Sequence, residues 1–386
     1  MQTWPKVGLK WECGSTTGWG ILNLHLALHF AARGIMPVWF VPPDLRGINA
    51  IRRQILEPAR QLHEQVKVQL ANHTRIDVDI PVLCAVGNDF TQGALRFAVN
   101  GRPDIGLMFF ENSDFTAAGI ERSKAFAKII VGSTWNAQIL RALGLSNISV
   151  VMQGVDPTLF HPAPKSGLLG DRFVIFSGGK LEYRKGQDIV VAAVREFQKR
   201  HPETLLMVAW HNPWPNSIRE ITHGGLVDGV PQIVNGEIDF SNWLRRQGIG
   251  NSIDLGQLLH SQIPPLIREA DVALFPNRCE GGTNLVAMEC LACGVPTILS
   301  ANTGHLDLIS EETCYPLRKQ GLVKASQLYP AVREWGESDV GEIVETLERI
   351  HGDRVESRRR AAAGARAMEK LTLANFAARV LEEIPQ

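Results

Sequence analysis

The stretch that decides the fold is PNRCEGGTNLVAMECLACGVP, residues 276–296. It lies between two apolar runs, 271–275 and 297–300, each with the length of a buried β-strand. The residues between these runs predict a glycine-containing turn followed by an apolar helix. In an open α/β sheet, ligands bind where a strand ends and its helix begins, because the first N–H groups of the helix can hold phosphate oxygens. Glu280 and Glu289 bracket the helix start and can accept hydrogen bonds from sugar hydroxyls, so the stretch predicts a nucleotide-sugar site.

The same stretch resembles the donor-binding signature of the retaining family-4 glycosyltransferases (glycosyl transferases group 1). In that family a Glu-Gly pair and a short aliphatic stretch precede Glu-Ala-Met-Ala-Cys-Gly-x-Pro. Residues 289–296 (ECLACGVP) align with this second half without a gap and share its Glu, second Ala, Cys, Gly and Pro. Family members usually have seven residues between the two glutamates, whereas this chain has eight between Glu280 and Glu289. The loop 281–284 therefore carries one extra residue.

Composition narrows the class of protein. With 386 residues the chain can form two domains of ordinary size, and 45% apolar with 21% charged residues is typical of a globular protein. The 40 basic and 40 acidic side chains cancel, so no overall field favours nucleic acid as a partner. No apolar run approaches the roughly 20 residues that span a bilayer. The N-terminus lacks the basic-then-apolar form of a signal peptide, so we expect a cytoplasmic protein, with peripheral membrane contact left open.

Cysteine and histidine spacings favour neither disulfides nor a metal. Six cysteines in a chain of this length do not form a disulfide framework. Cys290 and Cys293 form a C-x-x-C inside an apolar helical stretch and are expected to be core thiols. His25 and His29 are four residues apart, but no third ligand is evident. The sequence therefore predicts no metal site.

Strand and helix signals alternate along the chain. Short apolar strands are expected in the first half at 7–11, 37–41, 81–86, 105–110, 128–132 and 148–152. Those of the second half are expected at 173–176, 205–210, 252–255, 272–275 and 297–300. Helices between them, the clearest at 187–200 and 284–293, predict two parallel sheets covered on both faces. A long helix is expected at 45–71, with Pro58 kinking or breaking it, and the proline-rich stretch 156–167 is expected to be a linker.

The resemblance implies the GT-B fold, an α/β fold with two Rossmann-like doubly wound domains facing a cleft. Residues 1–160 would form the N-terminal, acceptor-side domain and 161–365 the C-terminal nucleotide-sugar donor domain. The tail after Val340 has helical signals at 342–350, 357–370 and 372–383. In the family the last helix crosses back, so 366–386 would pack on the N-terminal domain.

The second informative motif is GGKLEYRKG, residues 178–186. Gly179 lets the backbone approach a ligand closely, and Lys180 and Lys185 would neutralise a diphosphate. The family usually has Gly-Arg-Leu, three residues and then Lys-Gly, so Lys180 stands at the arginine position. A lysine there keeps the charge but loses bidentate geometry. A solvated basic turn is the alternative.

Two further positions come from the first half of the chain. The loop GSTTGWG at 14–20, with Gly18 and Gly20, lacks the Lys-Ser/Thr of a P-loop and the G-x-G-x-x-G spacing. The resemblance puts this loop beside the donor phosphates or the acceptor; a tight structural turn is the alternative. Glu111 follows the strand at 105–110, where many family members have a histidine that contacts the transferred sugar. Glu111 would hydrogen-bond a sugar hydroxyl or steady positive charge at the anomeric carbon, and a capping or acceptor-contacting carboxylate is the alternative.

Together with the motif residues described above, the resemblance implies a hexosyltransferase-like enzyme. Such an enzyme transfers a sugar from a nucleoside diphosphate donor to an acceptor with retention of configuration. The resemblance implies that no metal and no cofactor would be needed. Lys180 and Lys185 would stabilise the diphosphate, Glu280 would contact the donor sugar and Glu289 the ribose. Phosphate or sugar oxygens would be held by backbone amides of the loop that contains Gly281, Gly282, Thr283, Asn284 and Leu285.

The acceptor could be a glycan, a lipid, a protein or a small molecule. Two other functions remain open: a GT-B sugar-nucleotide epimerase or hydrolase, and a non-catalytic nucleotide-sugar binding protein. The departures at Glu111 and Lys180 are what suggest the binding protein.

Overall fold

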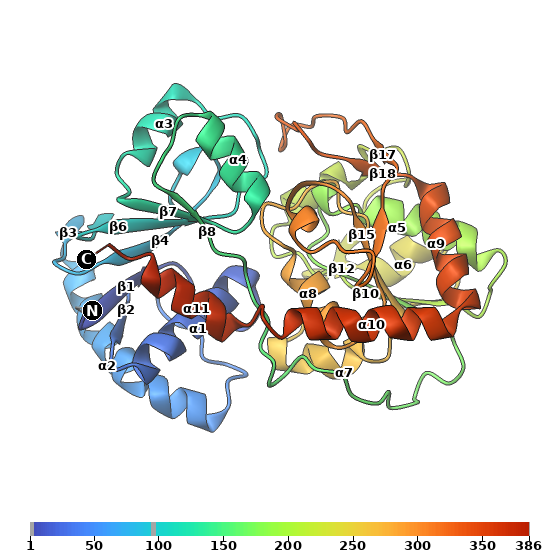
Figure 1. Ribbon diagram of the computed structural model, residues 1–386, viewed down its shortest axis with the longest axis horizontal. Helices are drawn as coiled ribbons and strands as arrows, with labels where there is room; N and C mark the ends of the chain where they lie inside the picture. The colour runs from blue at the N-terminus through green and yellow to red at the C-terminus, as the bar shows by residue number, and fades with distance from the viewer. Residues whose placement is uncertain (1–3, 94–97, 386) are drawn as a thin grey trace. The chain divides into compact units, whose positions relative to one another are not determined.

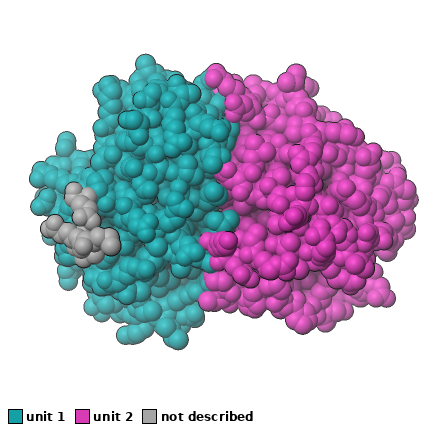
Figure 2. Space-filling view, in the orientation of Figure 1, with its two compact units in different colours: residues 1–156, 259–261, 371–386 teal, residues 157–258, 262–370 magenta. Residues whose placement is uncertain are grey.

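The computed structural model describes residues 4–93 and 98–385, so Met1–Thr3 of the N-terminus, whose signal-peptide character was considered above, lie outside the described residues. The chain forms two compact units, shown in separate colours in Figure 2. Unit 1 comprises 1–156, 259–261 and 371–386, and unit 2 comprises 157–258 and 262–370. Both are α/β units built on a parallel six-stranded sheet.

In unit 1 the strand order is β2-β1-β4-β6-β7-β8, with every pair parallel. The strands are β1 (Lys6–Lys10), β2 (Met36–Trp39), β4 (Val82–Val86), β6 (Asp104–Met108), β7 (Lys128–Val131) and β8 (Ile148–Val150). The helices are α1 (Gly18–Ala32), α2 (Ala50–Ala71), α3 (Ala117–Ser123), α4 (Thr134–Ala142) and α11 (Leu373–Glu382). β3 (Arg75–Asp77) pairs with β5 (Ala98–Asn100) beside the main sheet. The strand order reverses between β1 and β4, so the loop after β1 lies where such sheets bind ligands.

In unit 2 the order is β13-β10-β9-β14-β15-β16, again parallel throughout. Its strands are β9 (Val174–Gly178), β10 (Leu205–Ala209), β13 (Ser252–Asp254), β14 (Val272–Phe275), β15 (Thr297–Ser300) and β16 (Tyr315–Leu317). Its helices are α5 (Gln187–Gln198), α6 (Phe240–Arg246), α7 (Ile263–Ile267), α8 (Leu285–Ala292), α9 (Val340–Gly352) and α10 (Arg354–Met368). If the six strands of this sheet are numbered 1 to 6 along the chain, their order in the sheet is 3-2-1-4-5-6, as in a dinucleotide-binding sheet. The strand order reverses between β9 and β14.

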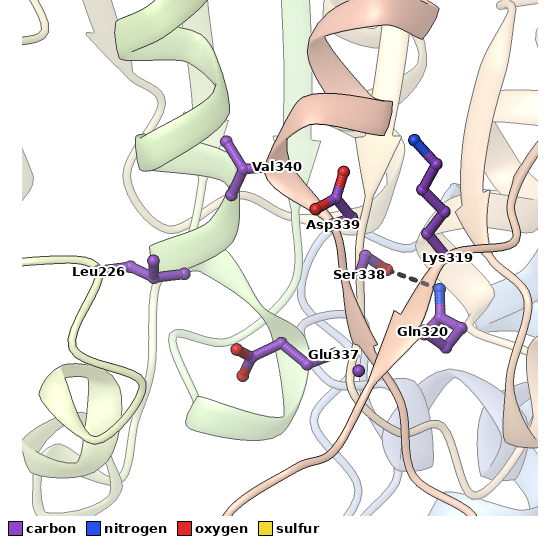
Figure 3. A pocket seen from close by; sticks show the side chains of 8 residues that line it. Leu226, Lys319, Gln320, Glu337, Ser338, Asp339 and Val340 are labelled. Carbon is purple, nitrogen blue, oxygen red and sulfur yellow. Dashed lines mark hydrogen bonds between the residues drawn. The ribbon is translucent and has the colours of Figure 1, made fainter.

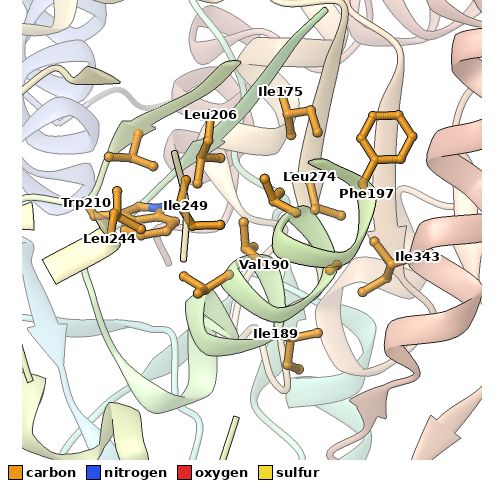
Figure 4. Close-up of a cluster of buried hydrophobic side chains, with 14 of the residues drawn as sticks. Ile175, Ile189, Val190, Phe197, Leu206, Trp210, Leu244, Ile249, Leu274 and Ile343 are labelled. Atoms are coloured by element: carbon orange, nitrogen blue, oxygen red, sulfur yellow. The ribbon is translucent and has the colours of Figure 1, made fainter. Parts of the chain in front are cut away.

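One continuous apolar cluster of unit 2 lies between the sheet and the helices α5, α6 and α9 (Figure 4). Strand residues such as Ile175, Leu206 and Leu274 meet Val190 and Ile343, and all five side chains are fully buried. Full burial of an aliphatic side chain of this size contributes about 1.5–3 kcal/mol. Because β9 and β14 are central strands of this core, the loops that leave their carboxyl ends start from rigid positions.

The last helix belongs to unit 1. α11 packs against α1, and Trp4 Nε1 donates to the carbonyl of Pro385 over 3.2 Å (Figure 1). The backbone at Val155 pairs with Leu371 and Leu373 through two N–H···O bonds of 2.9 Å each. The α/β fold with two doubly wound units and a returning C-terminal helix is therefore confirmed.

Several local expectations need correction. The long helix α2 begins at Ala50, where the Asn49 side chain accepts from Arg52 N–H, and it continues unbroken through Pro58. Pro58 is exposed, so the carbonyl that loses its helical donor can bind water, and the expected break is wrong. The sequence reading also missed the edge strand β16 and two short hairpins. These are β11 (Gln232–Val234) with β12 (Glu237–Asp239), and β17 (Gln320–Gly321) with β18 (Glu337–Ser338).

The cysteine expectation is confirmed, since all six thiols are free and buried. No helix in the described ranges combines the length and the apolar character that crossing a membrane requires.

Gly154 is where the C-terminal segment comes closest to the strand-end backbone of unit 1. A Cβ at this position would lie 2.1 Å from the carbonyl carbon of Thr372, so Gly154→Ala must displace the segment that leads into α11. Overpacking of this kind costs about 1–3 kcal/mol, and we expect the urea midpoint of unfolding to fall accordingly. Gly250→Ala is the control, because nothing lies within 4 Å of its Cβ position. Equal midpoints for the two variants would refute the close approach.

Candidate functional site

Two loops of unit 2 meet at the point where the strand order reverses. One leaves β9 and runs through a 3-10 turn at Tyr183–Lys185 into α5; the other leaves β14 and runs into α8. These are the two motifs singled out in the sequence, and β9 and β14 are adjacent parallel strands. Their carboxyl ends therefore lie at the same edge of the sheet, which is where doubly wound sheets bind their ligands.

Lys185 and Glu280 form an ion pair at this edge. Lys185 Nζ donates to Glu280 Oε1 over 2.5 Å, across 95 residues of sequence, and Asn277 Nδ2 donates to the same oxygen. The two side chains are 11% and 6% exposed. Arg184 Nη1 lies 3.5 Å from the other carboxylate oxygen. Two residues predicted separately for the diphosphate and the sugar are thus brought into direct contact.

The pKa values follow from this pairing. Burial alone would raise the pKa of Glu280, but the charges of Lys185 and Arg184 outweigh it and lower the pKa to about 2. Burial lowers the pKa of Lys185, and the Glu280 carboxylate opposes that effect. Glu280 is therefore ionised at neutral pH. Its negative charge offsets part of the cost of burying the neighbouring cations.

Arg278 fixes the two loops to each other. Its guanidinium is fully buried and binds Asp188, in the first turn of α5, through two parallel bonds of 2.8 Å. Nη1 also donates to the Tyr183 carbonyl and Nε to Glu337 Oε2, each over 2.8 Å. The backbone N–H of Arg278 donates to the carbonyl of Arg184 over 2.7 Å. The turn that carries Lys185 is thereby held against the segment that carries Glu280.

Lys180 lies at the exposed rim of the same loop. Its side chain is 36% exposed, with Nζ 3.1 Å from Glu182 Oε1 and 4.4 Å from the centre of the Trp214 ring. Gln187 Nε2 donates to the carbonyls of Gly179 and Lys180 and so fixes the turn between them. Lys180 and Lys185 therefore come from one loop, one at its rim and the other buried.

The start of α8 is held by a directed chain of hydrogen bonds. Asn284 adopts φ 59° and caps the helix, its side-chain oxygen accepting from Ala287 N–H. Its amide nitrogen lies 3.0 Å from His305 Nε2, and His305 Nδ1 lies 3.0 Å from Ser300 Oγ, which donates to the Asn277 carbonyl. Burial lowers the pKa of His305 to about 4. The ring is therefore neutral at pH 7, accepting at Nε2 and donating at Nδ1.

The other predicted residues of α8 and its loop lie around these hydrogen bonds. Glu280 N–H donates to Thr303 Oγ1, and Gly304 N–H donates to the Glu280 carbonyl. The predicted residues Gly281, Gly282 and Thr283 are buried in the turn before the helix. Leu285 is the first residue of α8, and Glu289 is buried one turn further on.

The three remaining predicted residues belong to unit 1. Gly18 and Gly20 begin α1 after the loop from β1, and Thr17 caps this helix by accepting from Gly20 N–H over 3.0 Å. Glu111 follows β6 and is half-buried, with its N–H donating to Asn88 Oδ1. The rings of Trp19 and Phe109 are 4.8 Å apart, so the start of α1 and the end of β6 lie side by side.

A hollow of about 460 Å³ also opens on unit 2, between β17, β18 and the start of α9 (Figure 3). Lys319, Gln320, Glu337 and Ser338 contribute to its lining, and Gln320 Nε2 donates to Ser338 Oγ. None of the predicted site residues lines it. Glu337 connects it to the site through its bond to Arg278.

Sequence reasoning missed Arg184, Arg278 and His305. Arg278 did carry a signal: it closely follows a strand predicted to be buried, and a buried arginine needs a carboxylate partner. The partner, Asp188, stood in the first turn of a predicted helix. Nothing in the sequence pattern paired His305 with Asn284, because 21 residues separate them.

The sequence of unit 2 is similar to that of known proteins. Residues 163–328 match the family described as Glycosyl transferases group 1. Over 192 residues the chain is 28% identical to glycogen synthase of Mycobacterium tuberculosis, a match covering 47% of this chain and 39% of the relative. A 25% identity over 171 residues relates it to a GDP-mannose-dependent alpha-(1-6)-phosphatidylinositol monomannoside mannosyltransferase of Mycolicibacterium smegmatis, covering 39% of this chain and 37% of that one. The chain thus spans about two fifths of the length of these curated relatives.

Solved structures match nearly the whole chain. Anabaena Alr3699/HepE in complex with UDP-glucose gives a TM-score of 0.65 at 14% identity and covers 98% of both chains. Sucrose-phosphate synthase from Thermosynechococcus elongatus gives 0.64 at 17% identity and covers 97% of both. These likenesses establish the GT-B fold.

The Arg278–Asp188 pair generates a stability prediction. Asp188→Asn keeps the side-chain shape but leaves a buried guanidinium without its bidentate partner, and removing one member of such a pair costs about 3–5 kcal/mol. Urea unfolding followed by tryptophan fluorescence measures the loss. Glu196→Gln is the control, since it breaks an exposed pair with Lys199 on the same helix and should change little. A midpoint for Asp188→Asn equal to that of the control would contradict the assigned role of Arg278.

His305 generates a pH prediction. The pKa of the ring is about 4 in the folded state against 6.5 as the ordinary value, so the unfolded state binds more protons between these pH values. Stability is therefore expected to fall as pH drops from 6.5 towards 4. His305→Gln offers an acceptor and a donor without titrating, and should flatten this part of the curve.

Unfolding midpoints at pH 7 and pH 4.5 test the effect of His305. Burial also lowers the pKa of His25 in unit 1 to about 4, so the readout is the difference between wild type and variant. His161→Gln, at an exposed position of unit 2, should keep the wild-type difference. An unchanged slope in His305→Gln would show that the ring is not the buried neutral group described above.

Proposed function

We propose that this chain, whose residues 163–328 belong to the glycosyl transferases group 1 family, transfers a sugar from a nucleoside diphosphate donor to an acceptor, with retention of configuration and without a metal ion. The observation that carries the proposal is the Lys185–Glu280 pair, with Arg184 beside it, at the strand-order reversal of unit 2. The relatives that match the same region are named as sugar-transferring enzymes, and a structural neighbour was solved with UDP-glucose.

The basic residues of the β9–α5 loop suit a diphosphate leaving group. Negative charge develops on the diphosphate as the bond to the sugar breaks, and preorganised cations stabilise it most strongly where water is excluded. Lys185 is almost fully buried, and Lys180 lies at the rim of the same loop. Lys185 would hold a phosphate oxygen from within, and Lys180 would reach the diphosphate from the solvent side.

Glu280 would change partners when donor binds. In the structure its carboxylate neutralises Lys185, which burial would otherwise drive toward the uncharged form. A phosphate oxygen near Lys185 would take over that neutralising role. Glu280 would then be free to accept a hydrogen bond from a hydroxyl of the donor sugar, as the sequence analysis predicted.

The remaining contacts are assigned by position. Backbone amides of 281–285 would hold phosphate or sugar oxygens at the start of α8, and Glu289 would bind the ribose. On unit 1, Gly18 and Gly20 would bring backbone close to the phosphates or the acceptor. Glu111 would hydrogen-bond the sugar or steady positive charge at the anomeric carbon. We assign no enzymic nucleophile.

UDP-glucose and GDP-mannose are the donors to test first, because the first is bound by a structural neighbour and the second is named in a relative's activity. Donor candidates can be ranked by the rise in Tm, since a bound ligand stabilises the folded state by RT ln(1 + [L]/Kd). Glycan, lipid, protein and small-molecule acceptors then form the panel for transfer.

Lys185→Ala is expected to lower kcat about 100- to 1,000-fold, because losing one preorganised transition-state contact has effects of that size. Release of nucleoside diphosphate from the preferred donor measures the change. Lys199→Ala removes an exposed lysine of the same unit and should leave turnover unaffected. Normal turnover in Lys185→Ala would sink the assignment.

The products distinguish the proposal from its competitors. Transfer with unchanged anomeric configuration by NMR, in the presence of EDTA, is the expected result. Free sugar would indicate a hydrolase, and an altered sugar nucleotide an epimerase. Tight donor binding without turnover across the panel would indicate a binding protein.

A further inference from the structure

Two imidazoles and two carboxylates gather at the end of α5 opposite the site described above. His201 and Glu203 lie in the turn after α5, whereas Glu348 and His351 lie in the last turns of α9, which packs along α5. Lys185 precedes the first residue of α5, and a helix of its length, Gln187–Gln198, extends about 18 Å. The cluster is therefore remote from the proposed donor loop.

The distances suit a shared metal ion. His201 Nδ1 lies 3.7 Å from Glu203 Oε1, and His351 Nε2 lies 3.8 Å from the same oxygen. One potential ligand atom from each of His201, Glu203 and His351 lies within 4.8 Å of the other two. A movement of about 1 Å would bring the three atoms to the separation of ligands around a tetrahedral zinc ion with bonds of about 2.0–2.1 Å.

Glu348 orients one of the imidazoles from the outside. Its Oε2 lies 2.9 Å from His201 Nε2, and its Oε1 accepts from Arg200 Nε over 2.7 Å. Because Nε2 donates its proton to the carboxylate, Nδ1 keeps its lone pair on the side of Glu203. A carboxylate that fixes the tautomer of a histidine is the usual outer partner of a zinc ligand.

Aromatic packing holds both rings in place. His201 stacks on Phe197 with centroids 4.4 Å apart, and His351 meets the edge of the Phe173 ring at 5.0 Å. The two imidazoles are 4.3 Å apart. Two protonated rings at that separation would repel each other, whereas neutral rings are the form that binds metal.

We propose that His201, Glu203 and His351 bind a divalent transition metal ion of the zinc class, with Glu348 as the outer partner of His201. Two imidazoles and one carboxylate are nitrogen and oxygen ligands that suit zinc, cobalt or nickel rather than magnesium or calcium, which prefer oxygen. The fourth position would be taken by water. The ion would join the turn after α5 to the end of α9, so it stabilises unit 2 and leaves sugar transfer unchanged.

The full chain, stripped with EDTA and desalted, is titrated with zinc sulfate by calorimetry and by competition with a chromophoric chelator. We expect one ion per chain with a micromolar or tighter Kd, and a rise of several degrees in Tm at saturating zinc. Magnesium and calcium should produce neither effect. The readout does not depend on sugar transfer, so the result stands apart from the proposed function.

Four variants locate the site. Glu203→Gln and His351→Ala should weaken zinc binding at least 10-fold, as should Glu348→Gln through the tautomer of His201. Glu203 is 48% exposed, so its variant tests the site without disturbing the core. His161→Ala, an exposed histidine of the same unit, should bind as wild type does. Zinc affinity and Tm shift that are equal in wild type, Glu203→Gln and His351→Ala would mean an adventitious ion only, and would overturn the proposal.

Discussion

The buried guanidinium of Arg278 is the constraint on which the geometry of unit 2 depends. An isolated charge removed from water costs several kcal/mol, so the surrounding chain must supply partners of opposite charge and fixed direction. Asp188 supplies two and the Tyr183 carbonyl another, both from the segment that runs from β9 into α5, and Glu337 supplies one from β18. Meeting that requirement puts the turn before α5 against the loop before α8. The position proposed for Lys185 in catalysis thus depends on the hydrogen bonds and ion pairs that the buried Arg278 guanidinium requires.

The same reasoning explains why Lys185 and Glu280 face each other. Neither side chain has enough exposure to be solvated alone, so each is neutralised by the other. In the proposed function, a diphosphate would compete with Glu280 for the lysine, and a sugar hydroxyl would offer Glu280 a replacement hydrogen bond. Binding a whole nucleotide sugar would therefore satisfy both residues, whereas a nucleotide without its sugar would leave Glu280 Oε1 with Asn277 as its side-chain donor.

The two motifs of unit 2 show which features of the fold and the site could be predicted from the sequence. Apolar runs and glycines placed β9, β14 and their loops in the chain, and the resemblance supplied the GT-B fold. Strand order and side-chain pairing are long-range properties, and a single sequence carries little trace of them. Arg278 and Asp188 are 90 residues apart, and no periodicity connects them. Pro58 shows the opposite failure. The proline is a strong local signal for a break, but α2 continues through it because the helix is held by its packing. The buried residues Leu56 and Ala59 flank the proline.

The conformation of Asn284 depends both on local sequence and on a long-range contact. The loop 281–284 ends on Asn284, whose positive φ is adopted readily by glycine and, among other residues, mainly by asparagine and aspartate. A left-handed residue at a helix start needs support, and His305 supplies it from the segment after β15 by accepting the asparagine amide. That support requires a neutral ring, which burial provides. Asn284 is therefore supported by a buried histidine that belongs to neither motif, so the start of α8 is set by the β15 end of the sheet as well as by its own sequence.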